Sequence, residues 1–561
     1  MLETAPGAST VSRVNERAGV THTSWFYVLA LIAAISLGVF VRAVPVVLHD
    51  FPLNDGGMFY QMVQELQANH YRLPGFTAYN MAGIPYAYSP FGFYATGLLS
   101  DITGLSLMTL FRWLPLAGAS LTIVAFFLLA RSLLSWAMAP AMAVIVAVVA
   151  FGLIPRTFVW MISGGGITRA FGFLFALLAL HQIHRLYIDR GSAHIFPAAL
   201  FIALSVLSHI GTARFLAVSL VLFWLFFGRH RHGVISSVVV VLAACAMMAP
   251  WLATIMAEHG LAPFLAANQT SGSFYSDQES LRHVLAQLSR FGTAQTSEPM
   301  FPLIGVLAFL GALASLTPRR ILLPIWWVAL IVLDARGAAT FTAVPMAMMA
   351  GLGITEVLIP ALNRAGDMWR KSGRFSDIPP SSFVTDSSHA RIGLVTTLIL
   401  GGFLLYSTVS AMIAPGFGTE GRFLVSLSPE ERTAMQWVAK STPADARFLV
   451  YPRDDFGHWA DKTAEWFPLL AERHSVTTIQ GYEWLPGFHI RIQKYQEAHD
   501  CQARTTSCLD AWEKKWDAGF THIFIPKSEA CCTALRASLS EDRRYQTIYD
   551  GPGVMVFARR I

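Results

Sequence analysis

The sequence predicts a polytopic α-helical membrane protein of about 11 transmembrane helices, followed by a C-terminal soluble α/β domain. Of its 561 residues, 54% are hydrophobic and 14% are charged, whereas a soluble domain carries ~25% charged residues. Apolar runs start at residues 25–48 and recur until about Ile413, each long enough to cross a bilayer core of ~30 Å. Beyond Ile413 the chain becomes polar, which indicates a soluble domain.

Arginines in the loops between the apolar runs predict the orientation. They precede the first run and then recur two crossings apart, ending in a basic connector at residues 364–391. Because cytoplasmic loops are enriched in Lys and Arg, we assign these loops to the cytoplasm. The net charge of +6 then reflects topology rather than nucleic-acid binding. The loop arginines are Arg13, Arg17, Arg131, Arg185, Arg190, Arg229, Arg231, Arg319 and Arg320.

This orientation divides the chain into three parts. Residues 1–24 are polar and are expected to form a disordered cytoplasmic N-terminus. Residues 25–414 form the transmembrane domain, whose outside loop at 50–101 is rich in aromatics, Gly and Pro and is expected to lie along the membrane interface. Residues 415–561 form the exterior α/β domain. We therefore expect a multi-pass protein of the cytoplasmic (inner) membrane, with this domain on the periplasmic side.

The tail alternates helical and strand patterns. Ser428 and Glu431 form a capping box before an amphipathic helix. The segments ARFLVYP, SVTTIQG, THIFIPK and VMVFAR read as strands, and their alternation with helices predicts a mostly parallel sheet.

The cysteines agree with an exterior tail. Cys245 lies inside an apolar run and is expected to fill the core, whereas the other four lie in the tail, where an oxidising compartment permits disulfides. Cys501–Cys508 is the most local pairing available. Zinc binding is the alternative, although the CxxC spacing typical of such sites is absent. The tail cysteines are Cys501, Cys508, Cys531 and Cys532.

Four arginines at the predicted outside ends of spans break the charge pattern. An arginine close to hydrocarbon is costly and usually has a partner, and its planar fork matches phosphate oxygens. As a set they predict binding of a phosphate-bearing lipid. For each one alone, the alternative is an interface residue or the partner of a local carboxylate such as Asp334. The four are Arg156, Arg169, Arg214 and Arg336.

The segment SGGGITR, which ends at Arg169, adds to the phosphate prediction. Gly165 and Gly166 precede a helical run, so their backbone N–H groups can face an anion at a helix N-terminus. A glycine triplet is also common in simple turns, which is the alternative.

The first outside loop, HDFPLNDGGMFY, carries two carboxylates, Asp50 and Asp55. A carboxylate at the membrane surface can take the proton from an attacking hydroxyl group. The alternative for Asp55 is a capping role for a helix that starts at Gly56.

Aromatic and acidic residues of the loop and the tail are candidates for contact with a sugar or an acceptor. Aromatic rings in HWADKTAEWFPLL and QGYEWLPG can stack on sugar faces while Asp461 and Glu465 accept hydroxyl groups. They can equally form the core of the small domain and its contact with the bundle. The candidates are Tyr60, Tyr86, Tyr88, Trp466, Glu483 and Trp484.

The stretches NDGGMFYQMVQEL and GIPYAYSPFGFYATGLL, within residues 42–98, resemble the GT-C superfamily of integral-membrane glycosyltransferases, which includes aminoarabinose, protein mannosyl and oligosaccharyl transferases. The resemblance implies a polyprenyl-phosphate-linked sugar donor, an envelope acceptor (lipid, glycan or protein) and inversion at the sugar. It matches Asp55 to the acidic catalytic residue of the family, and Asp50 is the second candidate for that role. Gly56 stands where many members have Glu, which leaves use of a divalent cation open. The Trp-Trp-Asp run typical of oligosaccharyltransferases is absent, so peptide-sequon recognition is not expected.

A non-enzymatic transporter, or an envelope-assembly scaffold that binds a lipid-linked sugar, is the alternative function. A transporter is expected to carry charged residues in mid-span or inverted repeats, and neither pattern is evident in the sequence.

Overall fold

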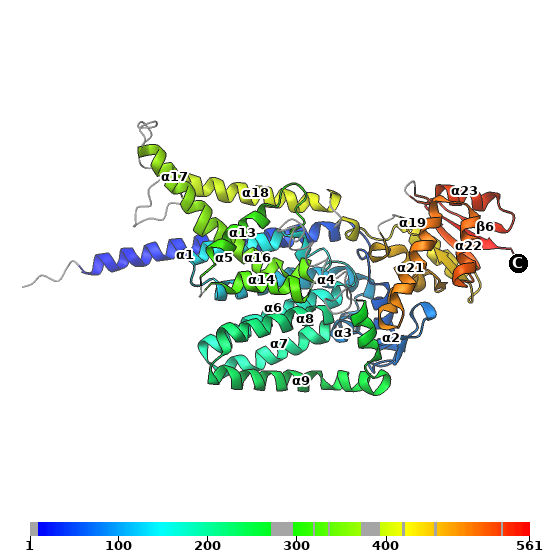
Figure 1. Cartoon of the computed structure of the whole chain (residues 1–561), viewed down its shortest axis with the longest axis horizontal. Coiled ribbons are helices and arrows are strands. Elements are labelled where there is room, and N and C mark those ends of the chain that lie inside the picture. Colours follow the sequence, from blue (N-terminus) through cyan, green and yellow to red (C-terminus); the bar gives the residue numbers. More distant parts are fainter. Residues whose placement is uncertain are drawn as a thin grey trace, which may run out of the picture.

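The computed structural model describes residues 9–270, 296–317, 320–334, 337–371, 393–417, 421–453, 457–528 and 531–560. It consists of a long helical bundle with a small α/β unit at one end, and the helix α1 projects from the other end (Figure 1). The short helices α2 and α3 lie at the end of the bundle that carries the α/β unit (Figure 1).

The bundle is built from α1 to α18. Within it, α6 packs against α4 and α7, α16 packs against α5 and α13, and α1 packs against α5. The helices are α1 (Ser9–Val47), α2 (Gly57–Ala68), α3 (Phe91–Thr103), α4 (Leu107–Leu133), α5 (Pro140–Leu153), α6 (Gly166–Asp189), α7 (Ile195–Ser208), α8 (Ile210–Phe223), α9 (Arg231–His259), α10 (Ala262–Gln269), α13 (Leu303–Ala314), α14 (Leu322–Leu333), α15 (Ala338–Phe341), α16 (Ala343–Leu352), α17 (Ile359–Lys371) and α18 (Leu394–Phe417).

Seven helical segments in the described part of the chain are long and apolar enough to cross a membrane, so the protein is a multi-pass membrane protein. Four shorter apolar helices accompany them, and the number of crossings, about 11, stays a prediction. The seven segments are Trp25–Val47, Leu107–Leu133, Gly166–Asp189, Ile210–Gly228, Arg231–His259, Ala338–Ala365 and Thr396–Ala414, and the shorter ones are Pro140–Leu153, Ser192–Ser208, Leu303–Ala314 and Leu322–Leu333.

Two local expectations differ from the structure. Residues 9–24 continue α1 instead of starting as a disordered segment, because extending an existing helix costs far less than nucleating one. Cys245 is exposed on α9, so its prediction as a core residue was wrong. Helix α9 lies along one edge of the bundle (Figure 1), where most of its surface has no protein neighbour.

The α/β unit contains a five-stranded sheet in the order β4-β3-β5-β7-β6. The pairings of β3 with β4 and β5 are parallel, whereas β7 is antiparallel to both β5 and β6. The sheet is therefore mixed rather than mostly parallel, because β6 and β7 form a hairpin with a connection too short for a parallel crossover. The strands are β3 (Arg447–Val450), β4 (His474–Ser475), β5 (His522–Pro526), β6 (Tyr545–Asp550) and β7 (Val554–Arg559).

Five helices accompany this sheet, and the first begins with the predicted capping box. The Ser428 side chain accepts from the backbone N–H of Glu431, and the Glu431 carboxylate accepts from the backbone of Ser428, which confirms that prediction. The helices are α19 (Pro429–Ser441), α20 (Lys462–Leu470), α21 (Phe488–His499), α22 (Thr506–Trp516) and α23 (Thr533–Glu541).

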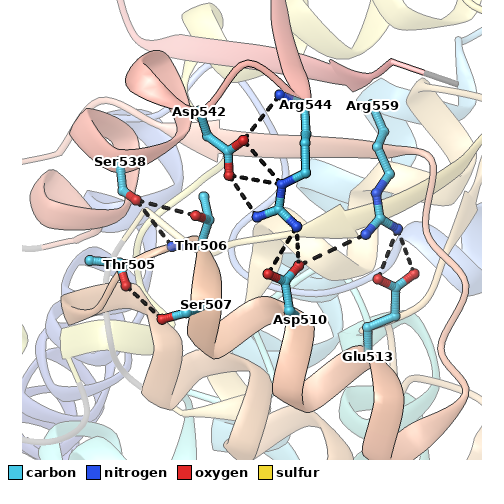
Figure 2. Close-up of polar contacts among 9 residues, drawn as sticks. All are labelled: Thr505, Thr506, Ser507, Asp510, Glu513, Ser538, Asp542, Arg544 and Arg559. Atoms are coloured by element: carbon cyan, nitrogen blue, oxygen red, sulfur yellow. Dashed lines mark hydrogen bonds and ion pairs between the residues drawn. The ribbon is translucent and has the colours of Figure 1, made fainter.

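Covalent and ionic links hold the far side of the α/β unit. The predicted Cys501–Cys508 disulfide is confirmed, and a second disulfide joins Cys531 to Cys532. Arg544 and Arg559 then tie the hairpin to α22 through carboxylates (Figure 2). On α22 these are the carboxylates of Asp510 and Glu513, and Arg544 also pairs with Asp542 at the C-terminal end of α23.

The first loop of the bundle binds the α/β unit directly. Leu53 forms an antiparallel bridge with Ser426, and Asn80 exchanges two hydrogen bonds of 2.7 and 3.0 Å with the backbone of Ser475. The indole N–H of Trp466 donates to the carbonyl of Asn54 (2.9 Å). Because buried hydrogen bonds are costly to break, this junction holds the loop in one place relative to the unit.

Candidate active site at the junction

Asp55 lies at this junction with both carboxylate oxygens engaged. Its Oδ1 accepts from the backbone N–H of Gly165 (2.9 Å), and its Oδ2 accepts from Nη2 of Arg169 (2.6 Å). The side chains of Asp55 and Arg169 are 15% and 18% exposed, so part of the pair remains in contact with solvent. Charge-assisted hydrogen bonds of this kind hold a carboxylate in a defined orientation.

The N-terminus of α6 supplies the backbone donor to Asp55. Gly165 is the N-cap residue of α6, and the helix dipole favours a negative charge there. The SGGGITR segment was predicted to face an anion, and the anion that Gly165 faces in the structure is the carboxylate of Asp55. Gly166 donates its backbone N–H to Ser163.

Arg169 is held by three further contacts. Its Nε donates to the carbonyl of Trp160 (3.0 Å), its Nη2 also donates to Oγ of Ser163 (2.7 Å), and its guanidinium lies 5.5 Å from the centroid of the Trp160 ring. A guanidinium with so many partners has little rotational freedom, so Arg169 fixes the direction of the carboxylate it binds.

Small residues allow this close approach of chain segments. Gly56 has φ +123°, and a Cβ on it would lie 3.1 Å from the backbone of Gly164. A Cβ on Gly57 would lie 2.7 Å from the carbonyl oxygen of Glu465. The glutamate that many GT-C members carry at the position of Gly56 therefore does not fit this backbone.

A second carboxyl group reaches the site from the α/β unit. Oε1 of Glu465, on α20, accepts from the backbone N–H of Gly56 (2.7 Å), the residue after Asp55. Burial, and then the charge of Asp55, raise the pKa of Glu465 well above its ordinary value. The shift favours protonation of Glu465, whereas the carboxylate of Asp55 is paired with Arg169. The sequence indicated Glu465 only as one of several acidic residues in the tail.

The candidate aromatic residues divide into two groups. Tyr86 and Trp466 are fully buried, and their polar atoms already donate, to the carbonyls of Met62 (2.7 Å) and Asn54 (2.9 Å) respectively. These two pack the junction. Tyr60 is half-buried beside Trp466, at 6.4 Å between ring centroids.

The remaining candidates form a separate group. Tyr88 packs on Trp484 at 4.7 Å between ring centroids. Glu483 precedes Trp484 and is close enough for its charge to raise the pKa of Glu465. Glu465 lies beside Asp55, so the group of Tyr88, Glu483 and Trp484 lies on the side of the junction that carries Asp55.

The predicted phosphate-binding arginines are not gathered on Asp55. Among the described members of the set, Arg169 alone is hydrogen-bonded to it, whereas Nε of Arg156 donates to Ser297 (2.7 Å). Arg214 lies 3.4 Å from the carboxylate of Asp334, the local partner proposed as its alternative. Arg336 lies outside the described residues.

Asp50 has a different environment from Asp55. Its side chain is 67% exposed and forms an ion pair of 2.6 Å with Arg432 on α19. The hydrogen bond from Arg432 lowers the pKa of Asp50. Asp50 therefore links the first loop to the α/β unit.

The donor set does not fit a divalent cation. In the described part of the chain, no group of three or more His, Cys, Asp or Glu side chains is arranged to hold a metal ion. A cation at Asp55 would have to displace the guanidinium of Arg169, and a protonated Glu465 is a poor ligand.

No family sequence model and no curated protein matches the chain. Solved structures do match. An oligosaccharyltransferase from Archaeoglobus fulgidus, tethered to an acceptor peptide, has a TM-score of 0.53 at 14% identity, over 96% of this chain and 74% of that one. ArnT from Cupriavidus metallidurans has a TM-score of 0.51 at 14% identity, over 96% of this chain and 98% of that one. The arabinofuranosyltransferase AftD from Mycobacteria has 0.54 at 13% identity, over 95% of this chain and 41% of that one.

The chain has the GT-C fold. The three GT-C structures are glycosyltransferases, and the resemblance read from residues 42–98 is thereby confirmed at the level of fold. Structures of the same proteins include the archaeal enzyme with a dolichol-phosphate and an inhibitory peptide, and ArnT bound to undecaprenyl phosphate. One further structure of the archaeal enzyme contains Zn and sulfate.

Proposed function

We propose that this GT-C protein is an inverting glycosyltransferase, which moves a sugar from a polyprenyl-phosphate carrier to an envelope acceptor (a lipid, glycan or protein) at the outer membrane face. The observation that carries the proposal is the placement of Asp55, a partly exposed carboxylate fixed by Gly165 and Arg169 where the bundle meets the α/β unit. GT-C structures with a dolichol-phosphate and with undecaprenyl phosphate support the class of donor.

Asp55 is the base in this mechanism. It takes the proton from the acceptor hydroxyl while the hydroxyl oxygen bonds to the anomeric carbon and the bond from that carbon to the phosphate oxygen breaks. The electron pair of the broken bond stays on the lipid phosphate. The two donors to Asp55 orient its free lone pairs before the acceptor arrives, which avoids reorganisation during the reaction.

The arginines bind the lipid phosphate in this proposal. Its charge grows as the sugar leaves, and guanidinium groups stabilise that growing charge. Arg169 is next to the base, and Arg156, Arg214 and Arg336 are the further candidates. The N-terminus of α6, at Gly165 and Gly166, adds the positive end of a helix dipole, although the N–H groups of both residues already have partners in the protein.

Glu465 reduces the charge at the site. Two adjacent ionised carboxylates would repel each other, so a protonated Glu465 leaves one negative charge opposite Arg169. Its O–H group can then donate to a sugar or acceptor hydroxyl. Tyr60, Tyr88, Glu483 and Trp484 are the proposed contacts to the sugar and the acceptor.

Transfer of labelled sugar from the polyprenyl-phosphate sugars of the cell's own membranes tests this function. Asp55→Asn keeps the size of the side chain and one of its two accepted hydrogen bonds but cannot act as a base, so transfer is expected to fall by about 10²–10⁴-fold. The matched control is Asp50→Asn, on the same loop, which should keep wild-type transfer because Asp50 pairs with Arg432 instead. A folded Asp55→Asn protein with wild-type transfer would refute the role of Asp55. A wild type that transfers nothing, with the donor shown to be present, would refute the enzyme and leave the transporter or scaffold.

A further inference from the structure

A cavity of about 540 Å³ lies at the other end of the bundle, bounded by the ends of α4, α6 and α14 and by Phe227 before α9. Helix α6 begins at the Asp55 site and reaches Arg185, one of the lining residues, 19 residues after Gly166. At 1.5 Å per residue, the cavity is about 28 Å from the candidate active site. The cavity therefore belongs to the opposite membrane surface, which the loop arginines predict to be cytoplasmic.

The lining of this cavity is cationic. Three arginines line it, against one lining carboxylate, that of Asp189. Arg185 pairs with Asp189 (2.5 Å), and Arg320 pairs with Glu356 (2.7 Å). The third, Arg131, is exposed and has no carboxylate within ion-pair distance among the described residues. Among the residues that the structure describes, one positive charge at the cavity is thus left without a counter-charge from the protein.

A buried histidine adds a polar group without a partner. His184 is 7% exposed, and its Nδ1 has no hydrogen-bond partner in the described part of the chain. It lines the cavity, with its ring packed edge-on against Phe227 at 4.8 Å between centroids. Buried polar atoms nearly always have partners, so this unpaired nitrogen leaves His184 with unused hydrogen-bonding capacity in the cavity wall.

Most of the remaining wall is apolar or aromatic, and Ser132, Ser135 and His181 are its further polar members. Trp136 lies under the guanidinium of Arg320, at 4.3 Å, in the manner of an interfacial tryptophan. Such a wall favours contact with an acyl chain, and a free inorganic anion has no such chain. The apolar lining residues are Leu128, Leu133, Ile188, Phe227, Leu322 and Leu323.

We propose that this cavity binds an anionic phospholipid of the membrane leaflet remote from Asp55. The phosphate lies against Arg131 and His184, and an acyl chain follows the apolar wall. Basic pockets between transmembrane helices are suited to acidic headgroups, because the arginine charge is balanced by the lipid and the chain stays in hydrocarbon. This site is independent of the proposed glycosyl transfer, since it needs none of the residues around Asp55.

Thermal unfolding of the delipidated full-length protein tests the proposal. Phosphatidylglycerol should raise the Tm of the wild type, whereas phosphatidylcholine and inorganic phosphate should not. Arg131→Gln should need roughly tenfold more phosphatidylglycerol for the same rise, because a charge-assisted hydrogen bond is lost. Arg131→Lys keeps the charge and should stay close to wild type. The matched control is Arg229→Gln, another exposed arginine at this end that does not line the cavity.

Each other outcome overturns the proposal. An equal rise with phosphatidylcholine would show that the lipid charge is irrelevant, and an equal rise with inorganic phosphate would show an anion site rather than a lipid site. Native mass spectrometry gives a second readout that does not depend on any variant. A wild type that retains no phosphatidylglycerol under conditions that keep it folded would also overturn the proposal.

Discussion

Replacing Gly165 by alanine tests whether the position of the Asp55 carboxylate controls transfer. Gly165 has φ −68° and ψ −4°, which alanine adopts without strain. The new methyl group, however, would lie 2.8 Å from Oδ2 of Asp55 and 2.7 Å from Nη2 of Arg169. Both atoms are the ends of side chains, so the ion pair moves while the backbone stays in place.

The size of this movement follows from the contact distance. Ordinary van der Waals contact of a Cβ begins at 3.4 Å, so the carboxylate oxygen must move by about 0.6 Å. A misplacement of ~1 Å in a catalytic group can cost ~10²-fold in rate. We therefore expect kcat to fall about tenfold to a hundredfold. The free energy of unfolding should change by less than about 1 kcal/mol, because the less favourable N-cap and the reduced entropy of the unfolded chain oppose each other.

Single-turnover transfer of labelled sugar at saturating donor measures this effect without interference from product release. The matched control is Gly402→Ala in α18, where no heavy atom lies within 4 Å of the added methyl group. The control should keep wild-type kcat and be slightly more stable, since alanine is the better helix former. Wild-type kcat in a folded Gly165→Ala protein would show that the geometry of the pair does not limit the reaction.

Three further predictions concern stability. The raised pKa of Glu465 stabilises the fold below the unfolded-state pKa of about 4.5, and this stabilisation is lost as the pH rises toward the folded-state pKa. Above pH 4.5 the free energy of unfolding of Glu465→Gln should therefore rise relative to that of the wild type by about 1.4 kcal/mol per pH unit in that window. Denaturant titrations at several pH values measure this difference, and a constant difference would contradict the prediction. Joint replacement of Cys501 and Cys508 by alanine should lower the free energy of unfolding by about 2 kcal/mol, because the unfolded chain regains the entropy of a loop with sequence separation 7. Tryptophan fluorescence in urea measures this loss, and an unchanged midpoint would show that the disulfide does not stabilise the fold. Asp50→Asn should cost less than about 1 kcal/mol in the same assay, because its ion pair with Arg432 is largely solvated, and a larger loss would mean that the pair holds the junction together.

Local sequence patterns predicted the elements well where one segment contained the whole signal. The capping box at Ser428 depends on residues three apart, and the Cys501–Cys508 link on residues seven apart. Three of the five strands of the sheet, β3, β5 and β7, lie in the segments predicted as strands, and β4 overlaps the predicted segment SVTTIQG only at Ser475. The hairpin strand β6 was missed because YQTIYD is mostly polar, and it is in large part exposed in the sheet. The two antiparallel pairings of β7, with β5 and with β6, make the sheet mixed.

The sequence predicted several residues of the candidate site separately, but it did not predict which of them are in contact. Asp55 and the SGGGITR segment were each recognised, one as a base and one as an anion site, but not as partners 110 residues apart. Glu465 is 409 residues from Gly56, and no local sequence pattern indicated that its carboxylate accepts from the backbone N–H of Gly56. Arg156 and Arg214, grouped with Arg169 by their place at the ends of spans, have other partners in the structure.

The sequence by itself therefore determined that the chain is embedded in a membrane and ends in a polar domain, because the length and polarity of a segment decide whether it can leave water. It also placed an acidic residue at the first loop. Only the tertiary structure decided which groups surround that residue, because packing of the bundle against the α/β unit brings Gly165, Arg169 and Glu465 together. Their charges and protonation depend on burial and on distances between residues far apart in the chain, and no local pattern specifies those quantities.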